Sequence, residues 1–312
     1  LALALSVGVL IQIQFTPEAL GQKKAGQLAV EKLPASQMAF PRREIHAFVG
    51  NPNNPLKIFL GTAGGLEASE NGGKSWLPVE IGGSHGEVFA LAQQRSNPNI
   101  LFAGRRDGLW RSDDGGGSWI PLPYPGSVPV SIALAESQPD TIYLGTAGSG
   151  VYKSVDGGYH WAATGAGLPE ARAGGRPEEV QALVVDPSDP NVLYASFPMR
   201  GIYRSVDGAA SWQELNQGLP ITMARAVGAA KIAANPENPK SLFLVVSERV
   251  HSHLIVTRLY MLGDNQRWLP VEAKLPREFP VLGLVVNRAT RKLEIWSQDS
   301  AWQIPLPEKA KH

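Results

Sequence analysis

Residues 112–119 read SDDGGGSW, and three further segments of the chain align with this one without gaps. They read SENGGKSW at 69–76, SVDGGYHW at 154–161 and SVDGAASW at 205–212. The shared pattern is Ser-x-Asp-x-Gly-x-Ser-Trp, from which Asn71, His160 and Ala209 depart. A short motif that returns at regular spacing indicates a structural repeat, so Asp114 must be interpreted as one of a series.

Each motif closes a larger unit of alternating strands and turns. In the second unit an apolar strand, VFALAQ (88–93), precedes a Pro-containing turn, SNPN, and the β-rich run LFAGRRDGLWRS (101–112). Successive units begin roughly 42–52 residues apart, which is the size of a four-stranded propeller blade. The six first strands begin near Ile45, Val88, Val130, Val180, Ala229 and Val281. We therefore predict an all-β fold, a single β-propeller of six four-stranded blades.

The two ends of the chain are predicted to meet in the last blade. The pattern weakens in the fifth unit (RLYMLGDNQRW, 258–268), and the sixth (LEIWSQDSAWQI, 293–304) lacks its outermost strand. LAVEKLP at 28–34 resembles LPVEAKLP at 269–276, the outer strand of the fifth unit. We expect the N-terminal strand to complete the last blade and close the ring. Seven blades are the alternative, if residues 28–44 form more than one strand.

The repeated motif itself is predicted to be a structural turn. Asp-Gly between two strands is a strong hairpin signal, because such turns need positive φ angles. Ser and Asp side chains can accept hydrogen bonds from the turn backbone, and Trp can cover the turn. A catalytic residue would not need four copies. The residues assigned to these turns are Ser69, Asn71, Trp76, Ser112, Asp114, Trp119, Ser154, Asp156, Trp161, Ser205, Asp207 and Trp212.

Two chemical interpretations of the motif fail on spacing. A calcium loop needs alternating acidic ligands and a distant Glu, which the segment after Asp113 does not supply. A phosphate-binding loop needs Gly-Lys-Ser/Thr at the start of a helix, whereas Lys74 and Ser75 lead into a strand. We expect no metal and no cofactor.

The composition fits a packed domain without disulfides. The chain has 312 residues, of which 43% are hydrophobic and 18% charged, and it contains no Cys. It can therefore bury a sizeable core, which must be stabilised by packing alone. The formal net charge is +1, so there is no bulk attraction to nucleic acid or anionic membranes. A basic stripe with interleaved aromatics, typical of nucleic-acid binding, is also missing from the sequence.

The first residues predict export. Residues 1–13 are almost entirely apolar, and Ala19-Leu20-Gly21 is a small-x-small cleavage site. We assign residues 1–21 to a signal peptide truncated at its start, 22–44 to an N-terminal segment with the closing strand, 45–307 to the propeller and 308–312 to a tail. The expected location is the periplasm or the cell exterior. An uncleaved membrane anchor is the alternative.

The four motifs resemble the Asp-box, or BNR repeat, of sialidases, sortilin-type receptors, xyloglucan-hydrolysing glycosidases and photosystem II assembly factors. The resemblance covers about residues 45–304 and implies an Asp-box β-propeller. In such propellers the Asp-box turns lie on one rim, while the second-to-third-strand loops and the blade connections gather on the opposite face. The fold alone does not fix a function, because enzymes, receptors and assembly factors share it.

The loops of that opposite face carry the candidate binding residues. Arg is more frequent than Lys in them, and guanidinium groups suit carboxylate, sulfate or phosphate. The alternative is that these are solvated charges of little individual effect. SERVHSHLIVTR at 247–258 is expected to be the longest of these loops, and a metal site there would need a third ligand. The candidate ligand-binding residues are Arg105, Arg106, Asp107, Arg200, Arg249, His251 and His253.

The same resemblance frames two functional hypotheses. A sialidase should show a Tyr nucleophile with a partner Glu and a Phe/Tyr-Arg-Ile-Pro stretch, which AFPRREI at 39–45 does not match. Xyloglucan hydrolases use two facing propellers, and this chain has length for one. We name no catalytic residue and expect a monomeric binding protein for a protein or glycan partner, anionic if the arginines contact it. An assembly or scaffolding role is implied by the photosystem II factors. A glycoside hydrolase is the alternative.

Overall fold

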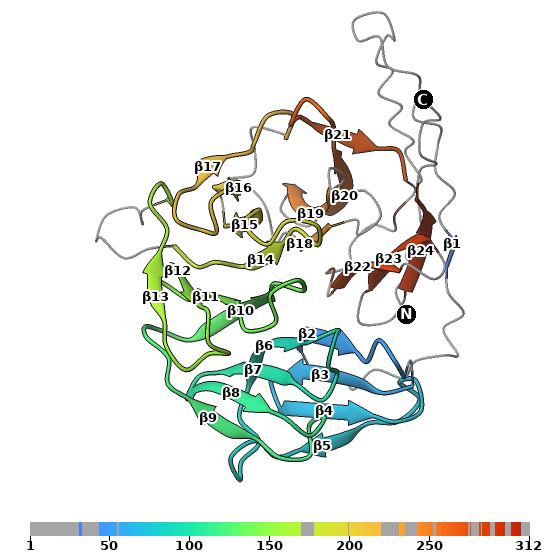
Figure 1. Cartoon of the computed structure of the whole chain (residues 1–312). Helices are drawn as coiled ribbons and strands as arrows, with labels where there is room; N and C mark the ends of the chain where they lie inside the picture. The colour runs from blue at the N-terminus through green and yellow to red at the C-terminus, as the bar shows by residue number, and fades with distance from the viewer. Residues whose placement is uncertain are drawn as a thin grey trace, which may run out of the picture.

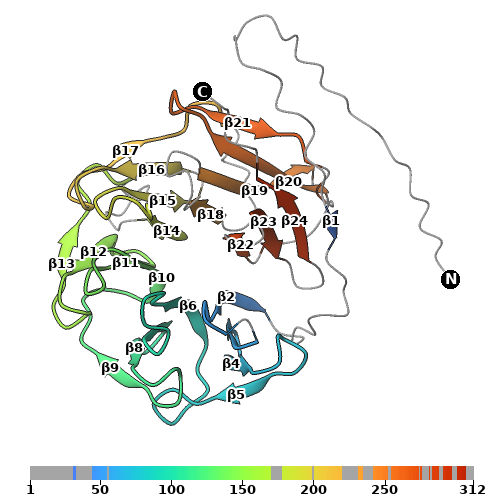
Figure 2. The same ribbon diagram turned by 45° about the vertical axis from the view of Figure 1, so that its right-hand side comes forward.

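The computed structural model describes residues 31–32, 44–54, 56–169, 178–198, 200–219, 231–234, 242–251, 254–273, 275, 281, 283–287, 291–296 and 301–306. They form six four-stranded sheets arranged as blades around a ring (Figures 1 and 2). All neighbouring strands within a sheet are antiparallel. The predicted six-bladed β-propeller is thus confirmed.

Each blade has an inner, a second, a third and an outer strand. The inner strands are β2 (Ile45–Gly50), β6 (Val88–Gln93), β10 (Pro129–Leu134), β14 (Ala182–Val185), β18 (Lys231–Ala234) and β22 (Gly283–Asn287). The second strands are β3 (Ile58–Thr62), β7 (Leu101–Arg105), β11 (Ile142–Thr146), β15 (Leu193–Phe197), β19 (Leu242–His251) and β23 (Lys292–Trp296). The third strands are β4 (Gly65–Ser69), β8 (Gly108–Ser112), β12 (Val151–Ser154), β16 (Gly201–Ser205), β20 (Leu254–Leu262) and β24 (Ala301–Pro305). The outer strands are β5 (Leu77–Val79), β9 (Ile120–Leu122), β13 (Ala162–Thr164), β17 (Gln213–Glu214), β21 (Trp268–Val271) and β1 (Glu31–Lys32).

The core lies between the faces of neighbouring blades. The second strands of blades 1 to 4 are buried along their whole length, because each is covered on both faces. Between blades 2 and 3, for example, Phe102 and Leu109 pack with Ile132 and Leu144. The outer strands are largely exposed, as in β5 and β13. Burial is therefore highest in the second strands and lower in the inner strands, such as β2 and β14, and in the outer strands.

The ring is closed by the N-terminal strand. Strand β1 pairs antiparallel with β24, Glu31 opposite Gln303 and Lys32 opposite Trp302, so that β1 is the fourth strand of the last sheet. In both views β1 lies beside β24, although the two come from opposite ends of the chain (Figures 1 and 2). This confirms the closing strand expected within residues 22–44.

The second strand of one blade approaches the start of the next blade so closely that small residues are needed. A Cβ on Gly61 would lie 2.8 Å from Val88 of the next blade, and one on Gly145 would lie 2.8 Å from Val180. Gly104 occupies the same position in blade 2, where a Cβ would lie 2.6 Å from the carbonyl oxygen of Pro129. Glycine at this position of the second strand is therefore required by packing.

One prediction of local structure was wrong. We expected residues 247–258 to be a loop, but strands β19 and β20 pair from Phe243 opposite Met261 up to His251 opposite Leu254. The β-branched run of Ile255, Val256 and Thr257 favours this extended ribbon. The described part of the chain contains no apolar helix of membrane-spanning length.

Candidate functional site

The Asp-box turns form a repeated hydrogen-bond network. In blade 2, Ser112 Oγ donates to Asp114 Oδ1 at 2.8 Å, and the backbone N–H of Gly116 donates to Ser112 Oγ at 2.9 Å. Asp114 also accepts from the backbone and the hydroxyl of Ser118, at 2.9 and 2.6 Å. These hydrogen bonds, first of all that from the Ser118 hydroxyl, lower the pKa of Asp114 well below its usual range.

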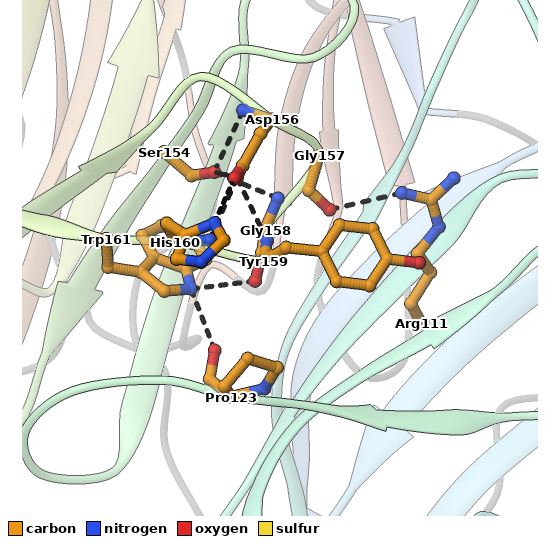
Figure 3. A network of polar contacts seen from close by, with 9 residues as sticks. All are labelled: Arg111, Pro123, Ser154, Asp156, Gly157, Gly158, Tyr159, His160 and Trp161. Atoms are coloured by element: carbon orange, nitrogen blue, oxygen red, sulfur yellow. Dashed lines mark hydrogen bonds and ion pairs between the residues drawn. The ribbon is translucent and has the colours of Figure 1, made fainter.

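The same contacts recur in the other three boxes. Figure 3 shows blade 3, where Asp156 contacts Ser154 and His160, and Trp161 Nε1 donates to the carbonyl oxygens of Gly158 and Pro123, both at 2.9 Å. Arg111 of blade 2 reaches the turn and donates to the Gly157 carbonyl oxygen at 3.1 Å. The acidic groups of these turns are thus fully engaged in structure.

Each box is also tied to the first turn of its own blade. The backbone N–H groups of Gly72, Gly115, Gly157 and Gly208 donate to carbonyl oxygens of the turn that joins the inner and second strands. The Asp-box turns and these first turns therefore share one rim, which we call the Asp-box rim. The second-to-third-strand turns and the blade connections lie at the other strand ends, which we call the loop face.

On the loop face, Arg105 holds two loops together. Its guanidinium donates to the Ile81 carbonyl oxygen at 2.6 Å, to Ser84 Oγ at 2.8 Å and to Asp107 Oδ2 at 2.9 Å. The side chain is 5% exposed, and Asp107 also accepts from Trp110 Nε1 at 3.3 Å. Arg105 and Asp107, both named as candidate ligand residues, are thus joined in a network that fixes the connection between blades 1 and 2.

The adjacent Arg106 is placed very differently. Its side chain is 74% exposed, and its guanidinium lies 3.6 Å from Glu87 Oε2 and 5.5 Å from the centre of the Phe89 ring. His46 stacks on the same ring, with centroids 5.6 Å apart, and its Nε2 lies 3.0 Å from Glu87 Oε1. Glu87 therefore bridges a histidine and an arginine across one aromatic ring. We call His46, Glu87, Phe89 and Arg106 the Glu87 cluster.

Irregular strand pairing contributes to this arrangement. In the first two blades the pairing of the inner with the second strand skips His46 and Phe89, and the same shift occurs at Val130 in blade 3. Such a bulge redirects the side chain of the skipped residue. The sequence analysis missed His46 and Phe89, and it counted Glu87 among the loop charges but not among the candidate ligand-binding residues. A signal was available for two of them. His46 and Phe89 are large side chains at the second position of their inner strands, and an alignment of the blades places them at equivalent positions.

Arg200 forms a second ion pair between loops, in blade 4. Its Nε donates to Glu178 Oε1 at 2.9 Å, and this hydrogen bond raises the pKa of Arg200. Glu178 belongs to the connection that precedes β14, so the pair repeats the principle seen at Glu87 and Arg106. The remaining candidates are less defined: Arg249 and His251 lie at the far end of β19, and His253 lies outside the described residues.

The described residues argue against a tyrosine nucleophile at Tyr203. This side chain is 5% exposed, and its hydroxyl donates to Glu214 Oε1 at 3.0 Å. Burial, followed by the hydrogen bond to Glu214, raises the pKa of Tyr203 to about 12. A nucleophilic phenol would need the opposite shift. Among the described residues, no three His, Asp or Glu side chains come together as a metal site would require.

Comparisons with known proteins support the fold assignment but do not identify a function. No protein-family model matches the sequence, and no curated protein matches it. Among solved structures, an ancestral GH74 enzyme aligns at 20% identity over 85% of this chain and 36% of that one, with a TM-score of 0.64. The GH74 xyloglucanase from Xanthomonas campestris aligns at 16% identity over 89% of this chain and 47% of that one, with a TM-score of 0.59.

The chain therefore spans less than half the length of these enzymes. A structure of YCF48 bound to D1 peptide aligns at 16% identity over 91% of this chain and 99% of that one, but its TM-score of 0.46 is too low to support an argument. At such identities the likeness shows the fold alone. The chain is a β-propeller structurally similar to the propellers of GH74 glycosidases.

Proposed function

We propose that this chain is an exported, non-enzymatic β-propeller that binds a protein or glycan partner through its loop face. The observation that carries the proposal is the Glu87 cluster, which combines an aromatic ring with charged groups and leaves Arg106 74% exposed. Arginine and aromatic side chains are enriched where proteins bind their partners. The polar groups of the Asp-box rim, in contrast, are used within their own turns.

The arrangement suits recognition better than catalysis. The loop-face carboxylates of Glu87, Asp107 and Glu178 each lie within ion-pair distance of an arginine of the protein itself. A glycoside hydrolase uses two carboxyl groups that flank the bond to be cleaved, whereas these three are engaged in contacts that hold the loops. An assembly or scaffolding role, implied by the resemblance of the repeat to photosystem II assembly factors, is compatible with such a binding face.

The experiment compares charge reversals on the two rims of one blade. Arg106→Glu should reduce capture of the partner from an envelope extract, and binding to a glycan array, by at least about tenfold, because arginine is enriched among the hot-spot residues whose loss costs about 2 kcal/mol or more. Arg95→Glu is the matched control, since Arg95 is 50% exposed and belongs to the first turn of the same blade, on the Asp-box rim. Equal capture by both variants would contradict the proposal.

A glycan-active hydrolase is the second candidate, favoured by the similarity to GH74 propellers. Fluorogenic sialosides and β-glucans test it directly. Turnover that disappears in Glu87→Gln or Glu178→Gln would establish an enzyme and overturn the non-enzymatic proposal. Arg105 is left unchanged in all these tests, because its network holds the loops in place.

A further inference from the structure

Glu87 is shared between an arginine and a histidine, two side chains that carry charge differently. Its Oε1 lies 3.0 Å from His46 Nε2, and its Oε2 lies 3.6 Å from the Arg106 guanidinium. An arginine in a protein stays protonated, whereas an ordinary histidine loses its proton at about pH 6.5. The total charge around Glu87 therefore depends on pH through His46.

The net charge of the Glu87 cluster follows from this arrangement. With His46 neutral, the charges of Glu87 and Arg106 cancel. With His46 protonated, the imidazolium neutralises Glu87 at hydrogen-bond distance, and the positive charge of Arg106 is left over. The side chains of His46 and Glu87 are 19% and 30% exposed, against 74% for Arg106, so this extra charge faces solvent at the arginine.

The charged groups on the neighbouring elements do not cancel the change. The main neighbours of strand β2 are β3 and β6, and neither strand contains an ionisable side chain. The chain next to the cluster adds Glu44, which is exposed ahead of β2, and Arg105, which lies 2.9 Å from Asp107. None of these three changes charge at the pH where an ordinary histidine does. The protonation of His46 therefore sets the charge of the cluster near neutral pH.

We propose that the Glu87 cluster is a pH-gated binding site for an acidic peptide segment of a partner, closed when His46 is neutral and open when it is protonated. This inference rests on the proposed function, in which Arg106 contacts the partner. The cluster itself indicates the chemistry of the ligand, since Arg106 already lies beside one carboxylate, that of Glu87. A carboxylate of the partner approaches the same guanidinium, so Glu87 repels it unless an imidazolium compensates.

The aromatic ring of the cluster favours an ionic contact over a sugar. Glycan rings bind by stacking on aromatic faces that are open to solvent. Two side chains, His46 and Arg106, already lie against the Phe89 ring, with separations of 5.6 and 5.5 Å from its centre. The cluster therefore offers a partner its exposed charge, which suits the carboxylates of an acidic peptide.

A labelled acidic peptide tests the gate on the full chain. Binding of a rhodamine-labelled hexa-aspartate peptide is followed by fluorescence anisotropy at low ionic strength, at about pH 5.5 and about pH 8. The peptide stays ionised at both, because the ordinary pKa of aspartate is about 4. The parent chain should bind at least about threefold more tightly at the lower pH, because one full charge changes beside the site. Equal affinities, or no binding at either pH, would overturn the proposal.

Two substitutions should hold the cluster in opposite states. His46→Gln is polar but never charged, so at about pH 5.5 it should bind only as tightly as the parent does at about pH 8. Glu87→Gln removes the opposing carboxylate, so at about pH 8 it should already bind as tightly as the parent does at about pH 5.5. A full pH response in His46→Gln, or weak binding by Glu87→Gln at about pH 8, contradicts the gate. If His46→Gln fails to fold, the parent and Glu87→Gln still decide the question.

His85→Gln is the matched control for the histidine. His85 belongs to the same connection between blades as Glu87, is 47% exposed and lies 3.5 Å from Glu80 instead. This variant should keep the pH response of the parent, and a response lost here but not in His46→Gln would assign the gate to the wrong histidine. A labelled galacturonic acid hexamer, with the same number of carboxylates, runs in parallel. Tighter binding of the hexamer than of the peptide would overturn the assignment to a peptide.

Arg106→Met separates the gate from the proposed function. If this variant loses partner capture at both pH values while the parent shows no pH response, the loop-face proposal stands and the gate fails. If it changes neither partner capture nor peptide binding, the proposed function fails and the gate fails with it. A pH response in the parent that disappears in Arg106→Met and in His46→Gln supports both.

Discussion

Strand β8 is flanked by two Asp-Gly sequences, one at each end. Their aspartates are used in different ways. At the Asp-box rim, Asp114 binds Ser112 and Ser118 within its own turn. At the loop face, Asp107 binds Arg105, which in turn holds a loop from the neighbouring blade. The first arrangement is complete within eight residues of sequence and recurs in four blades. The second depends on contacts between blades and is seen in one blade of the part of the chain that the structure describes.

Contacts between blades also explain why the neighbouring residues Arg105 and Arg106 differ in burial. Arg105 is the last residue of β7 and points between blades, where three hydrogen bonds compensate for its burial. Arg106 follows in the turn and stays at the surface above Phe89. Two adjacent arginines thus differ: Arg105 organises the loop face, and Arg106 stays largely exposed.

The largest expected effect of a substitution lies on the Asp-box rim. Trp119→Ala should lower the free energy of unfolding by about 3–5 kcal/mol, because the ring is 8% exposed and its loss leaves a cavity between blades. Urea unfolding measures the change, and Ile120→Ala, next in sequence and 45% exposed, is the control. Loss of partner capture by a folded Trp119→Ala protein, without a comparable loss of stability, would show that the rim is a binding site.

A smaller stability loss is expected from the loop face. Arg105→Met keeps the buried stem but leaves Asp107 and the Ile81 carbonyl oxygen without their charged donor, at a cost of about 1.5–3 kcal/mol. Thermal unfolding measures it, and Arg95→Met, half exposed on the other rim, is the control. A variant as stable as the parent would mean that Arg105 is a free ligand residue after all.

The contrast between the rims also marks what the sequence could predict. The Asp-box network is local, so the spacing of Ser112, Asp114 and Trp119 was sufficient to assign a turn, and the repeat then gave the blades and the closing strand. The Glu87 cluster joins residues 41 positions apart, His46 and Glu87, through strand pairing and a bulge. The charged loop residues of the sequence include Glu87 and Arg106, but nothing in their charge points to Phe89, the aromatic ring that Arg106 contacts. The ribbon of β19 and β20 was missed because its polar residues suggested a loop.

Stability at low pH should depend on whether an Asp-box carries Asp or Asn at its third position. Hydrogen bonds from Ser211 and Ser205 lower the pKa of Asp207 to about 2, so its contribution is present above the ordinary pKa of about 4 and is lost as pH falls toward 2. Asp207→Asn should be nearly as stable as the parent at pH 7, because Asn71 contacts the equivalent groups in blade 1, where its Nδ2 donates to the Ser75 hydroxyl instead of accepting from it. Its urea midpoint should fall less than that of the parent between pH 4 and 2, by the contribution of one carboxylate. Parallel curves would mean that the charge of Asp207 contributes nothing.

The smallest effect on stability is expected where the effect on binding is largest. Arg106→Met removes a 3.6 Å ion pair whose arginine is 74% exposed, so the free energy of unfolding should change by no more than about 1 kcal/mol. The same substitution should weaken partner capture, because the guanidinium above Phe89 is the exposed part of the cluster. Measured beside Arg105→Met, it gives a crossed result: Arg105 governs stability and Arg106 governs binding. If both properties changed together in each variant, the division of labour between these neighbouring arginines would be refuted, and the loop face would act as one network in which binding and folding cannot be separated.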